Sequence, residues 1–82
     1  MQRPTFPTLV DMPAGDAACI IRVDPADASR LAAEGLAPGD RVRVEARLPL
    51  GGPIVLRVGR ARVAVARRVA AGILVERETA AP

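Results

Sequence analysis

The sequence predicts a mainly β fold, a small five-stranded barrel with one short helix inserted after the first strand. Half of the 82 residues are apolar but only one is aromatic, so the core must be built from Val, Leu, Ile and Ala side chains. Valine-rich segments alternate apolar with charged residues, which is the pattern of half-buried strands. Seven glycines and eight prolines supply tight turns between such strands. A chain of this length forms a single domain.

The clearest strand covers residues 41–48, and a second strand covers residues 54–58. The predicted inner face of this hairpin consists of Val42, Val44, Ala46, Leu48, Ile54, Leu56 and Val58. Between the strands, residues 49–53 read PLGGP. The prolines remove backbone donors and the glycines allow positive φ, so we expect a protruding loop. Before the hairpin, Pro38 and Gly39 suit the two central positions of a type II turn.

The first strand is predicted at residues 17–23, where neither face is cleanly polar, so we expect burial on both sides. A helix of about ten residues follows, with Asp24 as N-cap, Pro25 at the first helical position and Gly35 at its C-terminal cap. Arg30 and Glu34 are expected to form an i, i+4 ion pair on its exposed side. The predicted apolar stripe of this helix is Ala28, Leu31, Ala32 and Leu36.

The second half of the chain continues with short elements. The pair Gly59-Arg60 predicts a tight turn into a strand at residues 61–66. A single helical turn at residues 67–71 and a last strand at residues 73–76 follow. These elements together resemble an SH3-like barrel, whose closure would remove exposed sheet edges.

The two ends of the chain lack a periodic pattern. We expect a flexible lead over residues 1–7, a folded domain over residues 8–77 and a frayed end over residues 78–82. At the start of the domain, Thr8 is expected to cap a single helical turn. Leu9 and Met12 of that turn would then cover one open end of the barrel.

The inventory of reactive side chains is poor. Cys19 is the single cysteine, so no intrachain disulfide can form, and we expect a small buried core thiol. The sequence has no histidine to serve as a base for a catalytic cysteine or as a zinc ligand. The carboxylates are scattered singly. We therefore predict a protein that is not an enzyme and has no cofactor or intrinsic transition-metal site; a weak surface or intermolecular metal site stays open.

The charge pattern does not favour nucleic acid. All twelve basic residues are arginine and nine acidic residues are interspersed among them, which leaves a net charge of +3. Aromatic side chains that could stack on bases are absent apart from Phe6. No segment is long and apolar enough for a membrane span or a secretory signal, so we expect a cytoplasmic protein.

Leu50 allows two interpretations. At the tip of a Pro-Gly loop it is either an exposed apolar anchor for a partner or a plug that folds back into the barrel end. The residues expected to bind a partner are Leu48, Leu50, Gly51, Gly52, Ile54, Leu31 and Arg47. A second candidate surface consists of Arg41, Arg43, Arg47, Arg57, Arg60 and Arg62. These arginines form either a merely solvated face or a contact with an acidic domain or an anionic membrane leaflet.

The order of the turn motifs resembles the FeoA family of bacterial ferrous-iron transport accessory proteins. A leucine precedes residues 13–16 (PAGD), residues 35–39 (GLAPG) are similar to the family's G-L-x-P-G signature, and residues 49–53 are similar to its P-L-G-G-P loop. The resemblance covers residues 9–76. One departure is at residues 66–69 (ARRV), which lack the acidic residues that commonly follow the fourth strand in the family.

The resemblance implies a small cytoplasmic partner of FeoB, the membrane permease for Fe(II) with a cytoplasmic GTP-binding domain. It implies a monomer or weak homo-oligomer that works by contact. The alternative is an SH3-like module associated with an iron-dependent repressor of the DtxR type or with nucleic acid. Because the chain begins with its own Met and has no room for a helix-turn-helix domain, we expect a free-standing protein.

Overall fold

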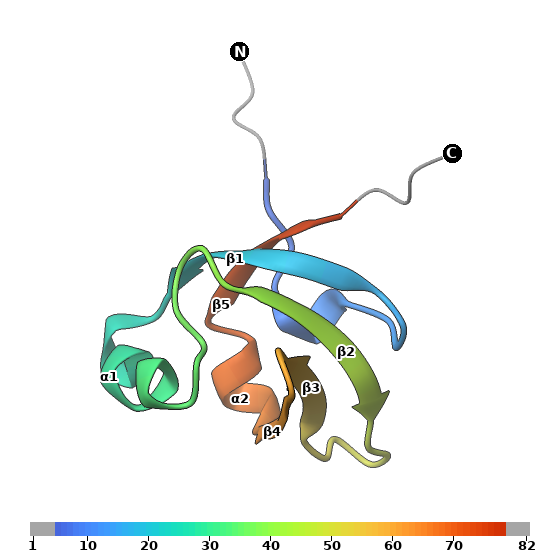
Figure 1. Ribbon diagram of the computed structural model, residues 1–82. Coiled ribbons are helices and arrows are strands. Elements are labelled where there is room, and N and C mark those ends of the chain that lie inside the picture. The colour runs from blue at the N-terminus through green and yellow to red at the C-terminus, as the bar shows by residue number, and fades with distance from the viewer. Residues whose placement is uncertain (1–4, 79–82) are drawn as a thin grey trace.

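Five strands form one antiparallel sheet in the order β4-β3-β2-β1-β5 in the computed structural model, which describes residues 5–78 (Figure 1). In chain order the elements are a 3₁₀ helix η1 (Leu9–Asp11), β1 (Ala17–Val23), α1 (Pro25–Ala33), β2 (Arg41–Arg47), β3 (Ile54–Val58), β4 (Ala61–Val65), α2 (Arg67–Ala70) and β5 (Ile73–Arg77). The predicted mainly β fold is confirmed, because each predicted strand and helical turn is present close to its expected bounds.

The sheet is curved but open, so the predicted closure into a barrel is wrong. β4 and β5 are its two edges, and no ladder joins them within residues 5–78. α2 follows β4 almost directly (Figure 1). Its Val69 and Ala70 are buried in the core. A helical turn therefore joins the two edge strands where a closed barrel would need hydrogen bonds between them.

Two β-bulges decide which side chains reach the core. Ile21 is the extra residue between Ile20 and Arg22 in the pairing of β1 with β5, and Glu45 is the extra residue of β2 opposite β3. A bulge moves the residues after it to the opposite face of the sheet. β1 therefore buries Ile20 and Val23 but leaves Ile21 37% exposed, which corrects the expected burial of this strand on both sides.

The bulge in β2 has the larger consequence for the surface. Val42 and Val44 are buried as predicted. After Glu45 the alternation reverses, and Leu48, which was expected on the inner face, is 41% exposed. The end of β2 therefore presents an apolar side chain outward.

α1 begins as predicted and differs from the prediction along its surface. The carboxylate of Asp24 accepts a hydrogen bond from the Ala26 N–H at 2.9 Å, which confirms the N-cap. Leu31 and Leu36 are buried, but Ala32 is exposed and does not belong to the stripe. Arg30 donates to Asp27 at 2.9 Å instead of pairing with Glu34. On a helix, a side chain can reach partners at both i, i+3 and i, i+4 spacing, and Arg30 uses the i, i+3 partner.

The core is aliphatic throughout and lies on the concave side of the sheet. Its buried residues are Leu9, Met12, Ala18, Ile20, Val23, Leu31, Leu36, Val42, Val44, Ile54, Leu56, Val65, Val69, Ala70, Ile73 and Val75. Leu9 and Met12 of the η1 region are fully buried, as expected for residues that cover one end of the sheet. Cys19 is only half-buried and is not a core residue, because it alternates with Ala18 and Ile20 on β1.

Backbone hydrogen bonds reach slightly beyond the expected domain bounds. The Val75 N–H donates to the Pro7 carbonyl at 2.9 Å, and the Glu78 N–H donates to the Ala17 carbonyl at 2.9 Å. Pro7 and Glu78 are therefore attached to the sheet. Residues 1–4 of the expected flexible lead and residues 79–82 of the expected frayed end lie outside the described residues.

Candidate functional site

The loop between β2 and β3 is a tight turn whose tip is Leu50. The Gly52 N–H donates to the Pro49 carbonyl at 3.1 Å, and the Leu48 N–H donates to the Pro53 carbonyl at 3.1 Å. Leu50 and Gly51 both have positive φ, at 59° and 72°, as the two central residues of a type I′ turn require. Glycine adopts this conformation freely, whereas leucine does so at a cost of roughly 1–2 kcal/mol.

Leu50 is completely exposed, with a relative accessible area of 103%. The interpretation of Leu50 as a plug of the barrel end is therefore wrong. Backbone strain held at an exposed position points to a functional constraint more than to a structural one. With Leu48 at 41% exposure at the base of the same loop, two leucine side chains are available to a partner. We call Leu48 and Leu50 the loop leucines.

The shape of the loop depends on close packing at its base. A Cβ atom on Gly52 would lie 3.0 Å from the Pro49 carbonyl oxygen and 3.1 Å from the Leu48 Cβ. Both neighbours belong to the turn itself and have little freedom to move. Gly52 therefore acts by allowing the turn to close.

Arg47 fastens the base of the loop to the N-terminal segment. Its guanidinium donates to the carbonyl oxygens of Val10 at 2.6 Å and of Met12 at 2.7 Å. These carbonyls belong to η1 and the residue that follows it, which lie far from β2 in the sequence. Arg47 was expected to touch a partner, and in the structure its charged group is used to position the loop.

Arg47→Ala is expected to lower the free energy of unfolding by about 1.5–3 kcal/mol, because two carbonyls lose a charged donor. Urea unfolding measures the effect. Arg60→Ala is the matched control, since Arg60 is exposed on the β3–β4 turn and makes no ion pair within the described part of the chain. Equal stability of the two variants would contradict this role of Arg47.

Two of the expected partner-binding residues are in the core. Ile54 is 0% exposed and Leu31 is 2% exposed, so neither can contribute to a surface contact directly. Ile54 is the first residue of β3 and points inward, opposite Val65 of β4. Leu31 is the α1 residue that packs against the sheet. The prediction failed for these two because nearness to the loop in sequence, or to the adjacent helix, does not decide which face a side chain occupies.

The outer face of the sheet holds a row of arginines. Arg43, Arg57 and Arg62 lie in register on β2, β3 and β4. The carboxylate of Glu45 pairs with Arg57 and with Arg62, each at 2.8 Å. Arg41 pairs with Glu78. Like charges on neighbouring strands repel each other, so the Glu45 carboxylate offsets the repulsion within the row.

Acid is expected to destabilise the protein through Glu45. The hydrogen bond from Arg57 holds the pKa of Glu45 below its ordinary value. A lowered pKa in the folded state stabilises the fold above the ordinary glutamate value, about 4.3, and this contribution is lost as the pH falls through the lowered value. The hydrogen bond from Arg41 lowers the pKa of Glu78 as well, which adds a contribution of the same sign.

Thermal unfolding between about pH 6 and about pH 3 measures this dependence. The sequence contains no histidine, so carboxyl groups alone titrate in this range. Glu45→Gln is expected to flatten the fall in midpoint with decreasing pH. A variant with the same slope as the wild type would show that Glu45 does not carry the effect.

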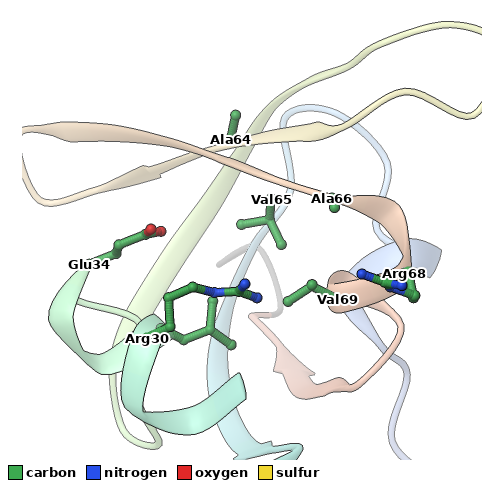
Figure 2. Close-up of a pocket in the computed structure, with 8 residues that line it drawn as sticks. Arg30, Glu34, Ala64, Val65, Ala66, Arg68 and Val69 are labelled. Atoms are coloured by element: carbon green, nitrogen blue, oxygen red, sulfur yellow. The ribbon is translucent and has the colours of Figure 1, made fainter. Parts of the chain in front are cut away.

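A groove that the sequence analysis did not anticipate lies between α1, β4 and α2 (Figure 2). Its volume is about 290 Å³, and it is lined by Arg30, Leu31, Glu34, Ala64, Val65, Ala66, Arg68 and Val69. Val65 points into the groove, and Arg30 extends across it from α1 toward α2 (Figure 2). Local sequence patterns carry no signal for such a groove, because its walls come from elements far apart in the chain.

Residues 5–78 contain neither a cluster of metal-ligating side chains nor a helix that could cross a membrane. No group of three or more His, Cys, Asp or Glu side chains lies close enough together to hold a metal ion. No helix in this part of the chain is long and apolar enough to cross a membrane.

Comparison with known proteins decides the family. The family model of the FeoA domain matches residues 8–77. The chain belongs to the FeoA domain family. A search of curated proteins found no match. The family membership confirms the resemblance that the order of the turn motifs suggested.

Solved structures agree with this FeoA assignment. The crystal structure of an iron uptake regulatory protein (FeoA) is 28% identical, covers 92% of this chain and 100% of that chain, and has a TM-score of 0.80. The FeoA protein from Chlorobium tepidum is 32% identical, covers 88% of this chain and 70% of that chain, and has the same TM-score, 0.80. A manganese-dependent transcriptional repressor is 29% identical with a TM-score of 0.79 and covers 94% of this chain, but this chain spans only 45% of the repressor.

The motifs that suggested the FeoA family form turns in the structure. Residues 35–39 end in a turn that is closed by the next residue, where the Asp40 N–H donates to the Ala37 carbonyl at 2.9 Å. Gly39 has a φ of 96°, which confirms the predicted type II turn. Residues 49–53 form the turn with the exposed Leu50. One FeoA motif therefore orients β2, and the other presents the loop leucines.

Proposed function

We propose that this FeoA-domain protein is a non-enzymatic cytoplasmic accessory of bacterial Fe(II) uptake. It acts by contact with the cytoplasmic GTP-binding part of a FeoB-type permease. The accessory role in iron transport follows from the family, whose model matches residues 8–77. A similar protein is described as an iron uptake regulatory protein, and another as an iron(II) transport protein.

The observation that carries the contact hypothesis is the fully exposed Leu50 at the tip of a hydrogen-bonded turn. Apolar side chains of this kind become hot spots when a partner buries them in a pocket. The turn is closed by its own hydrogen bonds and held at its base by Arg47, so little conformational freedom remains to be lost on binding.

The side-chain inventory suits a protein that works by contact. The sequence has no histidine and a single cysteine, and Cys19 is half-buried on β1. Nucleophilic and acid–base catalysis usually need a reactive group beside a second group that activates it. The 82 residues offer few such combinations.

Co-purification tests the proposal directly. The chain is expected to associate with the isolated GTP-binding domain of a FeoB-type permease, and with the full-length permease in detergent. A FeoB-type domain whose exposed apolar pockets have been filled by substitution serves as the control for non-specific adhesion. Lack of association with both forms of the permease would overturn the proposal.

The second candidate is a role beside a metal-dependent repressor or nucleic acid. The similarity to part of a manganese-dependent repressor favours it. A nucleic-acid role predicts binding that weakens steeply as the salt concentration rises, because phosphate contacts release counterions. Weak binding to duplex and single-stranded DNA, with little change between low and physiological salt, would exclude this role.

A further inference from the structure

β4 is an open edge with backbone groups free to pair. It hydrogen-bonds to β3 on one side, and no strand of residues 5–78 lies on its other side. In the β3–β4 hairpin, Val58 and Ala61 lie on either side of the two-residue turn. Two residues in that position exchange backbone hydrogen bonds with each other. Since bonded and non-bonded pairs alternate, the N–H and C=O groups of Arg62 and Ala64 point away from β3. Both residues are exposed.

The groove between α1 and α2 runs beside this same edge. Ala64 and Val65 of β4, with Ala66 directly after them, form one wall, and Val69 of α2 forms part of another (Figure 2). Leu31 of α1 also lines the groove. A strand added to β4 would direct alternate side chains to the side on which Val65 points. These side chains would enter a space of about 290 Å³ where they meet the apolar side chains of Leu31, Val65 and Val69, while Arg30, Glu34 and Arg68 supply charged groups to the same lining.

The charges beside β4 favour one kind of chain over another as a partner for its free edge. Arg62 is the last of the three arginines in the row on the outer face. On the three strands that carry this row, β2, β3 and β4, Glu45 is the single carboxylate. Arg68 stands on the rim of the groove and makes no ion pair within the described residues. A second copy of the chain would bring its own β4 against this edge, with Arg62 on the strand and Arg60, Arg67 and Arg68 in the segments that flank it, so charge disfavours pairing between copies.

We propose that β4 binds an extended peptide as a sixth strand, with apolar side chains in the groove and acidic side chains beside Arg62. Main-chain hydrogen bonds to Arg62 and Ala64 supply the affinity, and the alternation of apolar and acidic residues supplies the specificity. This contact is separate from the loop leucines and does not depend on the proposed partner of Leu50.

The probe is a synthetic peptide of alternating valine and glutamate with blocked ends, titrated by calorimetry into the full chain. We expect saturable binding, and new protection of the Arg62 and Ala64 amides from hydrogen exchange. Two control peptides are expected to lose at least tenfold in affinity: one with lysine in place of glutamate, and one with N-methyl groups on the backbone nitrogens that face β4. Absence of binding by the valine–glutamate peptide up to millimolar concentration would overturn the proposal.

Two variants locate the site. Ala64→Pro removes an outward N–H without touching the bonds to β3, so it is expected to fold and to lose at least tenfold in affinity. Arg62→Gln is expected to weaken binding, whereas Arg22→Gln is the charge-matched control, since β3 and β2 separate its strand, β1, from β4 in the sheet order. Leu50→Ala is expected to bind the peptide like the wild type. Should Ala64→Pro fail to fold, the N-methylated peptide still decides: affinity equal to that of the unmodified peptide would contradict strand addition.

Discussion

Leu50→Ala is expected to weaken binding to the permease's GTP-binding domain by tenfold or more while leaving thermal stability almost unchanged. The side chain is completely exposed in the free protein, so its truncation removes no buried contact of the fold. In a complex, an apolar side chain at the tip of a fixed loop is an anchor whose loss costs about 1.4 kcal/mol or more, which corresponds to the tenfold change. Affinity and unfolding midpoint are to be measured on the same sample.

Leu50→Asn separates the effect of the apolar side chain on binding from the effect of the positive φ on stability. Asparagine tolerates the positive φ that Leu50 adopts, and it removes the apolar surface at similar size. We expect unfolding stability equal to the wild type or higher by up to about 1 kcal/mol, together with the same loss of affinity as Leu50→Ala. Unchanged affinity in both variants would show that Leu50 is not the anchor.

Ile54→Ala is expected to have the opposite effects. Ile54 is fully buried, and removal of a large aliphatic side chain from a core costs about 2–5 kcal/mol. For a domain of this size, that loss lowers the midpoint of thermal unfolding by roughly 10 °C or more. The affinity of the folded fraction for the permease domain should stay near that of the wild type, although Ile54 lies just after the loop.

Ile54→Val is the matched control, with an expected cost of about 0.5–1.5 kcal/mol. Unfolding in urea measures both variants, and binding is to be measured at a temperature where each remains folded. A large loss of affinity in the folded Ile54→Ala protein would mean that this residue contacts the partner after all. The contrast between positions 50 and 54 therefore tests the division between the loop surface and the core.

The sequence by itself determined the local elements of this protein. Asp24 and Pro25 start α1 through a side-chain cap and a fixed φ, and these depend on neighbouring residues only. The type II turn at Pro38-Gly39 and the protruding loop at residues 49–53 follow from the same kind of local preference. The motifs that carry the FeoA resemblance are turns of this type, which explains why the family could be inferred from one sequence.

Only the tertiary structure decided which surfaces are available to a partner. The bulge at Glu45 turned Leu48 outward, and the one at Ile21 exposed that side chain in a strand that had been expected to be buried on both faces. The open β4 edge and the groove beside it exist because α2, instead of a ladder, joins β4 to β5. Strand register and sheet closure depend on contacts between residues far apart in the chain, whereas alternation along one strand reports only on neighbours.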